Sequence, residues 1–447
     1  MVIQVNGGVK RWQVVEWGAA AVLGSLPRML HPSPLLRGRA ALQGSGLHAF
    51  ARPCDADGGA SAARSTMTGM SRANDDSASR GELTLFLCGD VMTGRGIDQV
   101  LKHPGHPRLY EPYVKSAREY VALAEHVNGP LPTAVDDAYI WGDALATLDR
   151  LRTDVRIVNL ETSVTTSDSA WPNKGIHYRM HPANVGCLTA ARLDCCVLAN
   201  NHVMDWGRSG LIETLETLHA AGIRTAGAGR DRAEAATPAV IGVAGKARVL
   251  VFAYGMPSSG VPAAWAATQT LAGVNVLSDL SSRSVDGIAR DVDAYKRPGD
   301  VVVLSIHWGG NWGYDIGVAE QSFARRMIDT AGVDIVHGHS SHHPKGIEVH
   351  RERLILYGCG DLLDDYEGIA GYEEFRAELG YLYLPRIGTT GTLTRLLLVP
   401  TRIRRFRLNH ANAEETAWLT TVENREGRAL GTRAVAQPDG TLRIEWR

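Results

Sequence analysis

The sequence is poor in cysteine, in net charge and in long apolar runs, and each shortage argues against one class of protein. Six cysteines occur among 447 residues without CxxC or zinc-ribbon spacing, which favours buried thiols in a reducing compartment. The formal net charge of -1 argues against a general electrostatic grip on nucleic acid or on an anionic membrane. No stretch approaches the roughly eighteen consecutive apolar residues of a membrane-spanning helix. We therefore expect a globular protein with no nucleic-acid partner and no transmembrane segment.

The first part of the chain differs in composition from the rest. Residues 1–81 mix Arg, Pro, Ser, Gly and Ala without a sustained helical or strand period, so we predict a largely disordered leader. The apolar stretch 17–26 faintly resembles a signal peptide, but Glu16 precedes it and no clear cleavage site follows. We therefore expect a cytoplasmic protein, and a true start at Met67 or Met70 stays open as an alternative.

From residue 82 onward, apolar runs alternate with amphipathic segments, as they do in α/β proteins. Hydrophobic residues make up 44% of the chain, enough to cover a sizeable core. We predict an α/β fold in which two mixed β-sheets pack together with helices outside, a four-layer αββα sandwich. The domain would span 82–400, with 401–447 as a C-terminal extension packed on it. The predicted strands are 83–88, 155–160, 194–198, 239–243, 248–253, 300–306, 333–336, 347–349, 354–357, 393–399 and 402–408, and the predicted helices are 95–101, 114–125, 141–151, 182–191, 210–221, 284–295, 321–331 and 414–423.

Short polar signatures follow five of the apolar runs. Each run is typical of a buried strand, and open α/β sheets build their sites at the carboxyl ends of strands. Asp, Glu, Asn and His are oxygen and imidazole donors of the kind that hold Zn, Mn, Fe or Mg. We therefore predict a metal site at this edge of the fold. The signatures are Gly89-Asp90, Asn159-Leu160-Glu161, Asn200-Asn201-His202, His307-Trp308-Gly309 and Gly338-His339-Ser340-Ser341-His342.

In this order, the signatures resemble those of the CapA family of capsule and poly-γ-glutamate synthesis proteins, which is related to the calcineurin-like metallophosphoesterases. The resemblance extends over about residues 82–399. It implies the calcineurin-like metallophosphoesterase fold and a cofactor of one or more divalent metal ions, with Mn, Fe, Zn, Mg and Ca all open. Further matches lie beside the signatures, at Val91-Met92, Arg95, Asp205, Gly207 and Gly346-Ile347-Glu348.

The resemblance also implies roles for matched residues. His202 corresponds to the general acid beside the metals, and Asp205 is the acidic neighbour predicted to work with it. Two departures stand out: Val91-Met92 replaces the phosphoesterase Asp-x-His continuation, and Gly-His-Ser-Ser-His replaces Gly-His-His-Pro-His, so one usual histidine ligand is absent. The implied metal ligands are Asp90, Glu161 as the bridging carboxylate, Asn201, His307, His339 and His342.

Three residues near the signatures are predicted to contact an anionic or peptide-like substrate. Arg95 follows a strand and a turn and could face an anion bidentately, with a salt bridge as the alternative. Arg179 lies in the basic loop 174–182, which would either hold substrate or be solvated. Trp308 would line a cleft or simply pack. Asp361 is a further candidate carboxylate, with a solvated acidic turn as the alternative.

Three functions stay open at this point. The leading one is a metal-dependent hydrolase acting on a phosphorylated or polyanionic peptide-like substrate in capsule or poly-γ-glutamate-type polymer biosynthesis, with His202 protonating a leaving group. The second is a peptide epimerase in which His202 and Asp205 serve as acid and base. The third is a non-catalytic scaffold of a polymer-synthesis complex. At any single position, a capping hydrogen bond is the simpler interpretation. The oligomeric state stays open.

Overall fold

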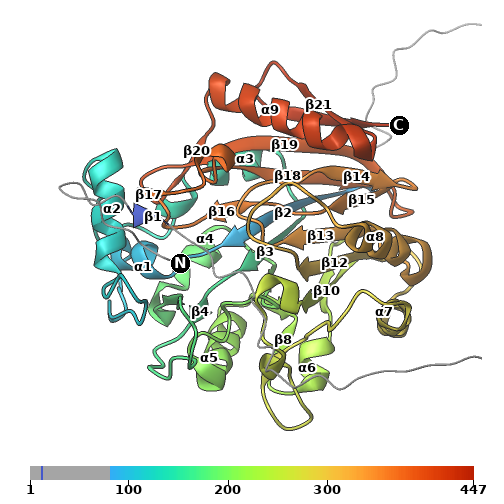
Figure 1. Ribbon diagram of the computed structural model, residues 1–447. Coiled ribbons are helices and arrows are strands. Elements are labelled where there is room, and N and C mark those ends of the chain that lie inside the picture. The colour runs from blue at the N-terminus through green and yellow to red at the C-terminus, as the bar shows by residue number, and fades with distance from the viewer. Residues whose placement is uncertain (1–11, 14–80) are drawn as a thin grey trace, which may run out of the picture. The chain divides into compact units, whose positions relative to one another are not determined.

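The computed structural model describes residues 12–13 and 81–447. The prediction of a disordered leader at 1–81 therefore falls almost wholly outside the described residues. The described chain is a mixed α/β protein in which most strands belong to two mixed β-sheets (Figure 1). Within these residues, no helix combines the length and the apolar character needed to cross a membrane.

The larger sheet contains ten strands: β2 (Leu83–Val91), β3 (Val155–Leu160), β6 (Cys195–Val197), β7 (Arg224–Ala226), β16 (Asp361–Leu363), β18 (Leu379–Ile387), β19 (Leu393–Ile403), β20 (Leu408–His410), β21 (Thr432–Ala436) and β22 (Leu442–Trp446). Their order is β21-β22-β19-β18-β2-β3-β6-β7, with β16 beside β2 and β20 beside β19. β2, β3, β6 and β7 run parallel, whereas β18 joins β2 in the antiparallel sense. β2 is therefore an interior strand, and its continuous apolar run is what burial on both faces requires.

The smaller sheet contains six strands: β9 (Ala239–Gly242), β10 (Arg248–Gly255), β12 (Val301–His307), β13 (Ile335–His339), β14 (Ile347–His350) and β15 (Arg353–Leu356). Their order is β14-β15-β13-β12-β10-β9. The four inner strands run parallel, and the edge strands β9 and β14 are antiparallel to their neighbours. Both β12 and β13 therefore end at the same edge of this sheet, each with a histidine.

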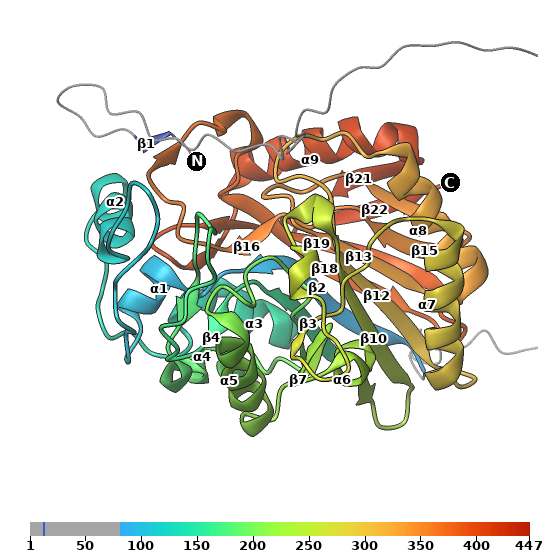
Figure 2. The same ribbon diagram turned by 60° about the horizontal axis from the view of Figure 1, so that its bottom comes forward.

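The smaller sheet separates two apolar cores. Val301 and Val303 of β12 belong to the main core, which also contains β2 and β3. The alternate residues Val302 and Leu304 pack instead with Phe323 and other residues of two long helices, α7 and α8, which run along this sheet (Figure 2). The helices are α1 (Arg95–Val100), α2 (Arg118–Asn128), α3 (Asp143–Arg150), α4 (Gly186–Ala190), α5 (Gly207–Ala220), α6 (Arg232–Ala236), α7 (Ser282–Tyr295), α8 (Val318–Ala331) and α9 (Ala413–Gly427).

Short two-stranded pairs complete the described strands. They join β1 (Trp12–Gln13) to β17 (Ile369–Ala370), β4 (Ser163–Val164) to β5 (Arg179–Met180), and β8 (Ala228–Gly229) to β11 (Gly273–Val274). The β4–β5 pair contains Arg179, one of the predicted substrate contacts, and directly follows the Asn159-Leu160-Glu161 signature.

Three expectations about the elements are wrong. The predicted strand 402–408 does not exist, because β19 continues to Ile403 and β20 begins only at Leu408. The helix expected from residue 114 begins at Arg118. The helix predicted at 414–423 was expected to be the last element, but β21 and β22 follow α9 and extend the larger sheet through the pairing of β22 with β19. β18 was not predicted at all.

Candidate metal centre

The carboxyl ends of four parallel strands bring the polar signatures together. Asp90 on β2 lies in register with Asn159 on β3, and His307 on β12 lies in register with His339 on β13. One ligand atom from each of Asp90, His307 and His339 lies within 4.8 Å of the others, and all three residues are buried. The two sheets thus meet at this edge, where each contributes donor groups to one cluster.

A second group of potential ligands shares Asp90 with the first. It consists of Asp90, His342 and Asp361, again buried and again within 4.8 Å of one another. Asp361 stands opposite Asp90 where β16 pairs with β2, and both of its carboxylate oxygens lie 3.0 Å from Nδ1 of His342. One carboxylate common to two ligand groups is the arrangement found in sites for two neighbouring cations.

The carboxylates of this cluster are crowded. The side-chain amide of Asn159 donates to Asp90 at 2.7 Å and to Glu161 at 3.0 Å, which holds the two acids side by side. Burial raises the pKa of Asp90, and burial together with the Asp90 charge raises the pKa of Glu161 well above its usual range. The buried Oδ2 atom of Asp90 has no hydrogen-bond partner among the described residues. Crowded acids with an unpartnered oxygen fit a divalent cation, which would compensate their charge.

The histidines of the cluster are in the form that binds metals. Burial lowers the pKa of His307 and of His339 well below the usual value, so both imidazoles are neutral and each has a nitrogen lone pair. Their Nδ1 atoms are 2.8 Å apart, Nε2 of His307 is 3.2 Å from the Asn201 side-chain oxygen, and Nε2 of His339 is 2.8 Å from the Ser305 hydroxyl. These outer contacts orient the rings, as partners of metal-binding histidines commonly do.

The predicted acid–base pair forms beside the carboxylates. Nδ1 of His202 lies 2.7 Å from Asp205, and Nε2 lies 3.9 Å from Glu161. Burial lowers the pKa of His202 to about 4. Burial by itself would raise the pKa of Asp205, but the charges of His202 and Lys174 outweigh it and the pKa falls. The Lys174 ammonium lies 2.9 Å from Asp205 and 3.1 Å from Nδ1 of His202.

Sequence reasoning missed two residues of this site. Asn159 stands in a predicted signature, two residues before Glu161, which directly follows β3; both side chains lie together, so period-two alternation could have identified Asn159. Lys174 gave no comparable signal, because a lysine in a polar loop is normally exposed.

Arg95 is a buried ion-pair residue in this structure. Its guanidinium forms a bidentate pair with Asp365 and donates to Glu111 at 3.1 Å and to the Tyr120 hydroxyl at 3.0 Å. It also lies 4.1 Å from the centre of the Tyr178 ring. Its donors are thus engaged within the protein. The salt bridge, which was the alternative to substrate contact, is the arrangement observed, and it lies in the interior rather than on the surface.

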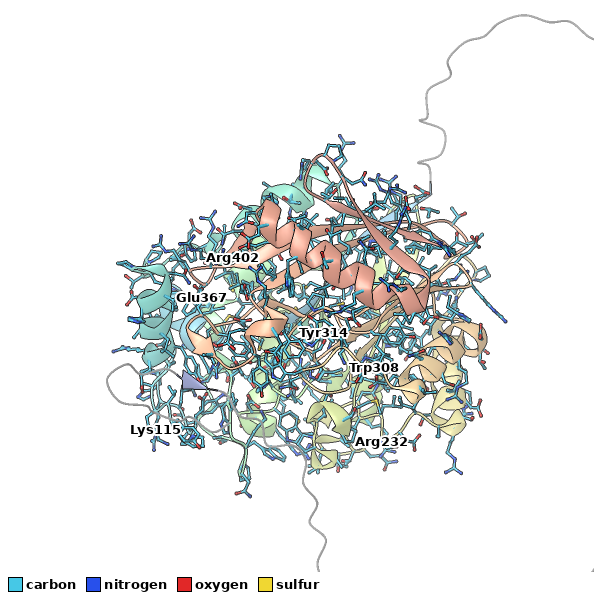
Figure 3. The ribbon with its side chains drawn as sticks, turned by 45° about the horizontal axis from the view of Figure 1, so that its top comes forward. Lys115, Arg232, Trp308, Tyr314, Glu367 and Arg402 are labelled. Carbon is cyan, nitrogen blue, oxygen red and sulfur yellow. The ribbon has the colours of Figure 1, made fainter. Side chains whose placement is uncertain are left out.

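Trp308 packs instead of lining a cleft. Its ring is 3% exposed, donates from Nε1 to the Tyr357 carbonyl at 2.9 Å and contacts Phe323 in the core beneath α8. Figure 3 labels Trp308 and, nearer to α9, Tyr314, whose ring centre lies 4.3 Å from the Arg425 guanidinium. Packing, the alternative for Trp308, is therefore what the structure shows.

Fold and site together define a class of α/β protein in which two mixed sheets gather buried carboxylates and histidines at one edge. Residues 84–366 match the family model described as bacterial capsule synthesis protein PGA_cap, and the chain belongs to this family, which is consistent with a metallophosphoesterase-like fold.

Curated relatives agree with this assignment. The chain is 48% identical over 364 residues to a probable polyglutamine synthesis accessory protein of Mycobacterium tuberculosis, covering 81% of this chain and 96% of the relative. It is 23% identical over 287 residues to the capsule biosynthesis protein CapA of Bacillus anthracis, covering 64% and 60%. It is also 25% identical over 291 residues to the PGA biosynthesis protein CapA of Bacillus subtilis, covering 63% of each chain.

Proposed function

We propose that this protein serves capsule or polyglutamate-type polymer synthesis as a metal-dependent enzyme that acts on a phosphorylated or polyanionic peptide-like substrate. The PGA_cap match and the names of the relatives support the process. One observation carries the metal dependence: Asp90 belongs to two buried ligand groups, and one of its buried oxygens has no hydrogen-bond partner within residues 12–13 and 81–447. We also propose that the two sheets and their helices form the four-layer sandwich of the calcineurin-like fold.

Each residue of the site has a place in this proposal. Asp90, His307 and His339 would hold one cation, and Asp90, His342 and Asp361 a second, with Glu161 and Asn201 beside them. A bound divalent cation supplies Lewis acidity and lowers the pKa of a water. Asp205 holds Nδ1 of His202, which leaves Nε2 facing the cluster. From there His202 would protonate a leaving group, a contribution of about 10²–10⁴-fold in rate.

The metal is tested on the full chain purified without chelator or metal-binding tag. Elemental mass spectrometry should find about two transition-metal ions per chain for two adjacent ligand groups. Asp90→Asn combined with His307→Ala should lose them, whereas His126→Ala, an exposed histidine on α2, should keep them. Metal retained by the double variant would refute the proposed centre.

The reaction is tested separately with a phosphoester such as p-nitrophenyl phosphate. His202→Ala should retain the metal and lose at least about a hundredfold in kcat, because only the proton donor is removed. Unchanged kcat in a metal-loaded His202→Ala protein would show that the hydrolysis does not use this residue.

A non-catalytic role in the same process is the second candidate. The mycobacterial relative is named an accessory protein, and His307, His339 and Ser305 already satisfy one another by hydrogen bonds. Polymer synthesis in cells separates the two candidates. A stably folded His202→Ala protein that supports normal synthesis favours the scaffold, and loss of synthesis favours the enzyme.

A further inference from the structure

The two arginines predicted to contact substrate are held by the protein itself. Arg179 donates to the exposed Asp168 at 2.8 Å and lies 3.9 Å from the centre of the Trp206 ring. Arg95 is 3% exposed and pairs with Asp365. Neither ligand group contains Arg95, so the proposed metal centre does not by itself account for this buried cation.

The backbone at Arg95 shows that its surroundings specify the position. The φ angle of 49° lies in the left-handed region, where a residue with a Cβ atom is strained. The forked pair with Asp365 holds the side chain, and the same carboxylate accepts a hydrogen bond from the Gly96 backbone at 2.8 Å. Strain of this kind persists only where several contacts fix a residue, and it occurs mostly at functional sites.

Two tyrosine rings connect this guanidinium to the site. The guanidinium carbon lies 4.1 Å from the centre of the Tyr178 ring and 5.7 Å from that of the Tyr366 ring. The Tyr178 hydroxyl donates to the Tyr366 hydroxyl at 3.2 Å. Tyr366 directly follows Asp365 in the chain, and its backbone N–H donates to Asp364 at 2.8 Å. Arg95, Asp365 and the two tyrosines therefore form one connected network.

Each tyrosine of this network contacts one histidine of the site. The rings of Tyr178 and His202 meet edge to face, with centres 4.6 Å apart and an angle of 81° between their planes. The rings of Tyr366 and His342 meet in the same way at 5.4 Å and 80°. Nδ1 of each histidine contacts a carboxylate, which fixes one atom of the ring but not its plane. An edge-to-face contact with a second ring adds that restraint.

We propose that Arg95 is a positioning residue of the candidate metal centre, which it aligns through Tyr178 and Tyr366. Tyr178 sets the plane of the His202 ring, and with it the direction in which Nε2 faces the cluster. Tyr366 sets the plane of the His342 ring beside the second ligand group. One buried guanidinium thereby keeps the proposed proton donor and the second cation site in a fixed relation. The inference rests on the proposed function only for what the two histidines do.

Imidazole nitrogen NMR of the chelator-treated full chain, with isotope-labelled histidine, tests the alignment without metal or substrate. Arg95→Lys keeps the positive charge and both tyrosine rings but cannot form the forked pair. The His202 and His342 signals, identified by their absence from His202→Ala and His342→Ala, should therefore both shift. Arg156→Lys is the matched control, because Arg156 is a buried arginine near the start of β3 that pairs with Asp149. It should leave both signals in place.

Two results would overturn the positioning role. One is a folded Arg95→Lys protein in which the His202 and His342 signals stay where they are. The other is an equal shift of both signals in Arg156→Lys, which would show a general loosening of the protein. If Arg95→Lys does not fold, variants of the two tyrosines decide the question.

Leucine at each tyrosine separates the two alignments. Tyr178→Leu should lower kcat for p-nitrophenyl phosphate on the order of tenfold while KM and the metal content stay unchanged, because only the proton donor is misaligned. Tyr366→Leu should weaken one of two Mn²⁺ sites about tenfold in a calorimetric titration of the chelator-treated chain, because His342 belongs to the second ligand group alone. Tyr178→Phe and Tyr366→Phe keep the rings and should restore both properties.

Tyr120→Leu is the matched control for these variants. Tyr120 is buried like Tyr178, and its ring centre lies 3.9 Å from the same guanidinium carbon. It packs, however, in a separate apolar cluster with Leu109, Val114 and Ala117, so its loss should change neither kcat nor Mn²⁺ affinity. Losses as large in Tyr120→Leu as in the other two leucine variants, or no loss in those two, overturn the positioning role.

The alignment and the proposed function can fail separately. A chain that binds no metal and cleaves no phosphoester overturns the enzyme proposal, yet the histidine signals of Arg95→Lys still decide whether Arg95 aligns the two rings. A chain that binds metal and cleaves the phosphoester while Arg95→Lys leaves both signals unmoved overturns the positioning role alone.

Discussion

Glu423 should make the stability of this protein fall as the pH rises. It lies on the buried face of α9, and burial, followed by the charge of Glu426, raises its pKa to about 8. The unfolded chain releases this proton near the ordinary glutamate pKa of 4.5, so the folded protein holds one proton more between pH 4.5 and 8. The stabilisation is complete below that window and is lost as the pH passes 8.

The magnitude follows from the width of the window. Within this window, each rise of one pH unit lowers the unfolding free energy by roughly 1.4 kcal/mol. Through this residue alone, the unfolding free energy should therefore fall by roughly 4 kcal/mol from pH 5 to pH 8. Other buried acids titrate as well, and Glu423→Gln isolates the contribution of this one. The variant should match the unmodified protein near pH 5 and exceed it progressively at higher pH.

Urea unfolding at pH 5, 7 and 9 measures this difference. Glu414→Gln, at an exposed position in the first turn of the same helix, controls for the loss of a formal charge and should leave the pH dependence unchanged. Parallel pH profiles for Glu423→Gln and the unmodified protein would refute the reasoning, because they would show that Glu423 is ionised in the folded state.

Three further predictions concern the framework and the metal. Arg95→Gln should lower the unfolding free energy by roughly 3–5 kcal/mol, since buried carboxylates lose their partner; a loss below 1 kcal/mol in urea titration would contradict the buried ion pair. Gly89→Ala should give little soluble protein, because a Cβ atom there would lie 1.8 Å from the Gly360 carbonyl oxygen, and a normally folded variant by circular dichroism would speak against this packing. Added Mn²⁺ should raise the melting temperature of the unmodified protein but not of Asp90→Asn, since a ligand of the folded state stabilises it; equal shifts in both proteins would argue against the centre.

The parts of the fold that the sequence predicts best are those with a strong local signal. The strand 155–160 has the predicted bounds, because the β-branched residues Val155, Ile157 and Val158 favour a strand and the polar Glu161 follows its last apolar residue. β18 was missed because Gly380 and Pro385 weaken its local pattern. Its place beside β2 is decided by pairing with strands far away in the sequence, which no local signal reports.

For the site residues too, the sequence predicts what a local pattern reports and misses what depends on distant residues. Placing donor residues at strand ends correctly brought Asp90, His307 and His339 together. Trp308 was assigned a possible cleft although Val302, Leu304 and Ile306 precede it at period two and face the helices; the same alternation puts Trp308 on that side and His307 on the other. The pairing of Arg95 with Asp365 joins residues 270 positions apart, and one sequence alone contains no signal for it.

The shared carboxylate of Asp90 has a consequence for how the protein is made. Asp90 belongs to the first strand of the domain, whereas its partner Asp361 is synthesised much later. At about 5–20 residues per second, a ribosome takes roughly 15–50 s to travel from one to the other. The first ligand group is incomplete until His339 has been synthesised, and the second is incomplete until Asp361 has been synthesised. The cation proposed for this cluster would therefore be captured late in translation.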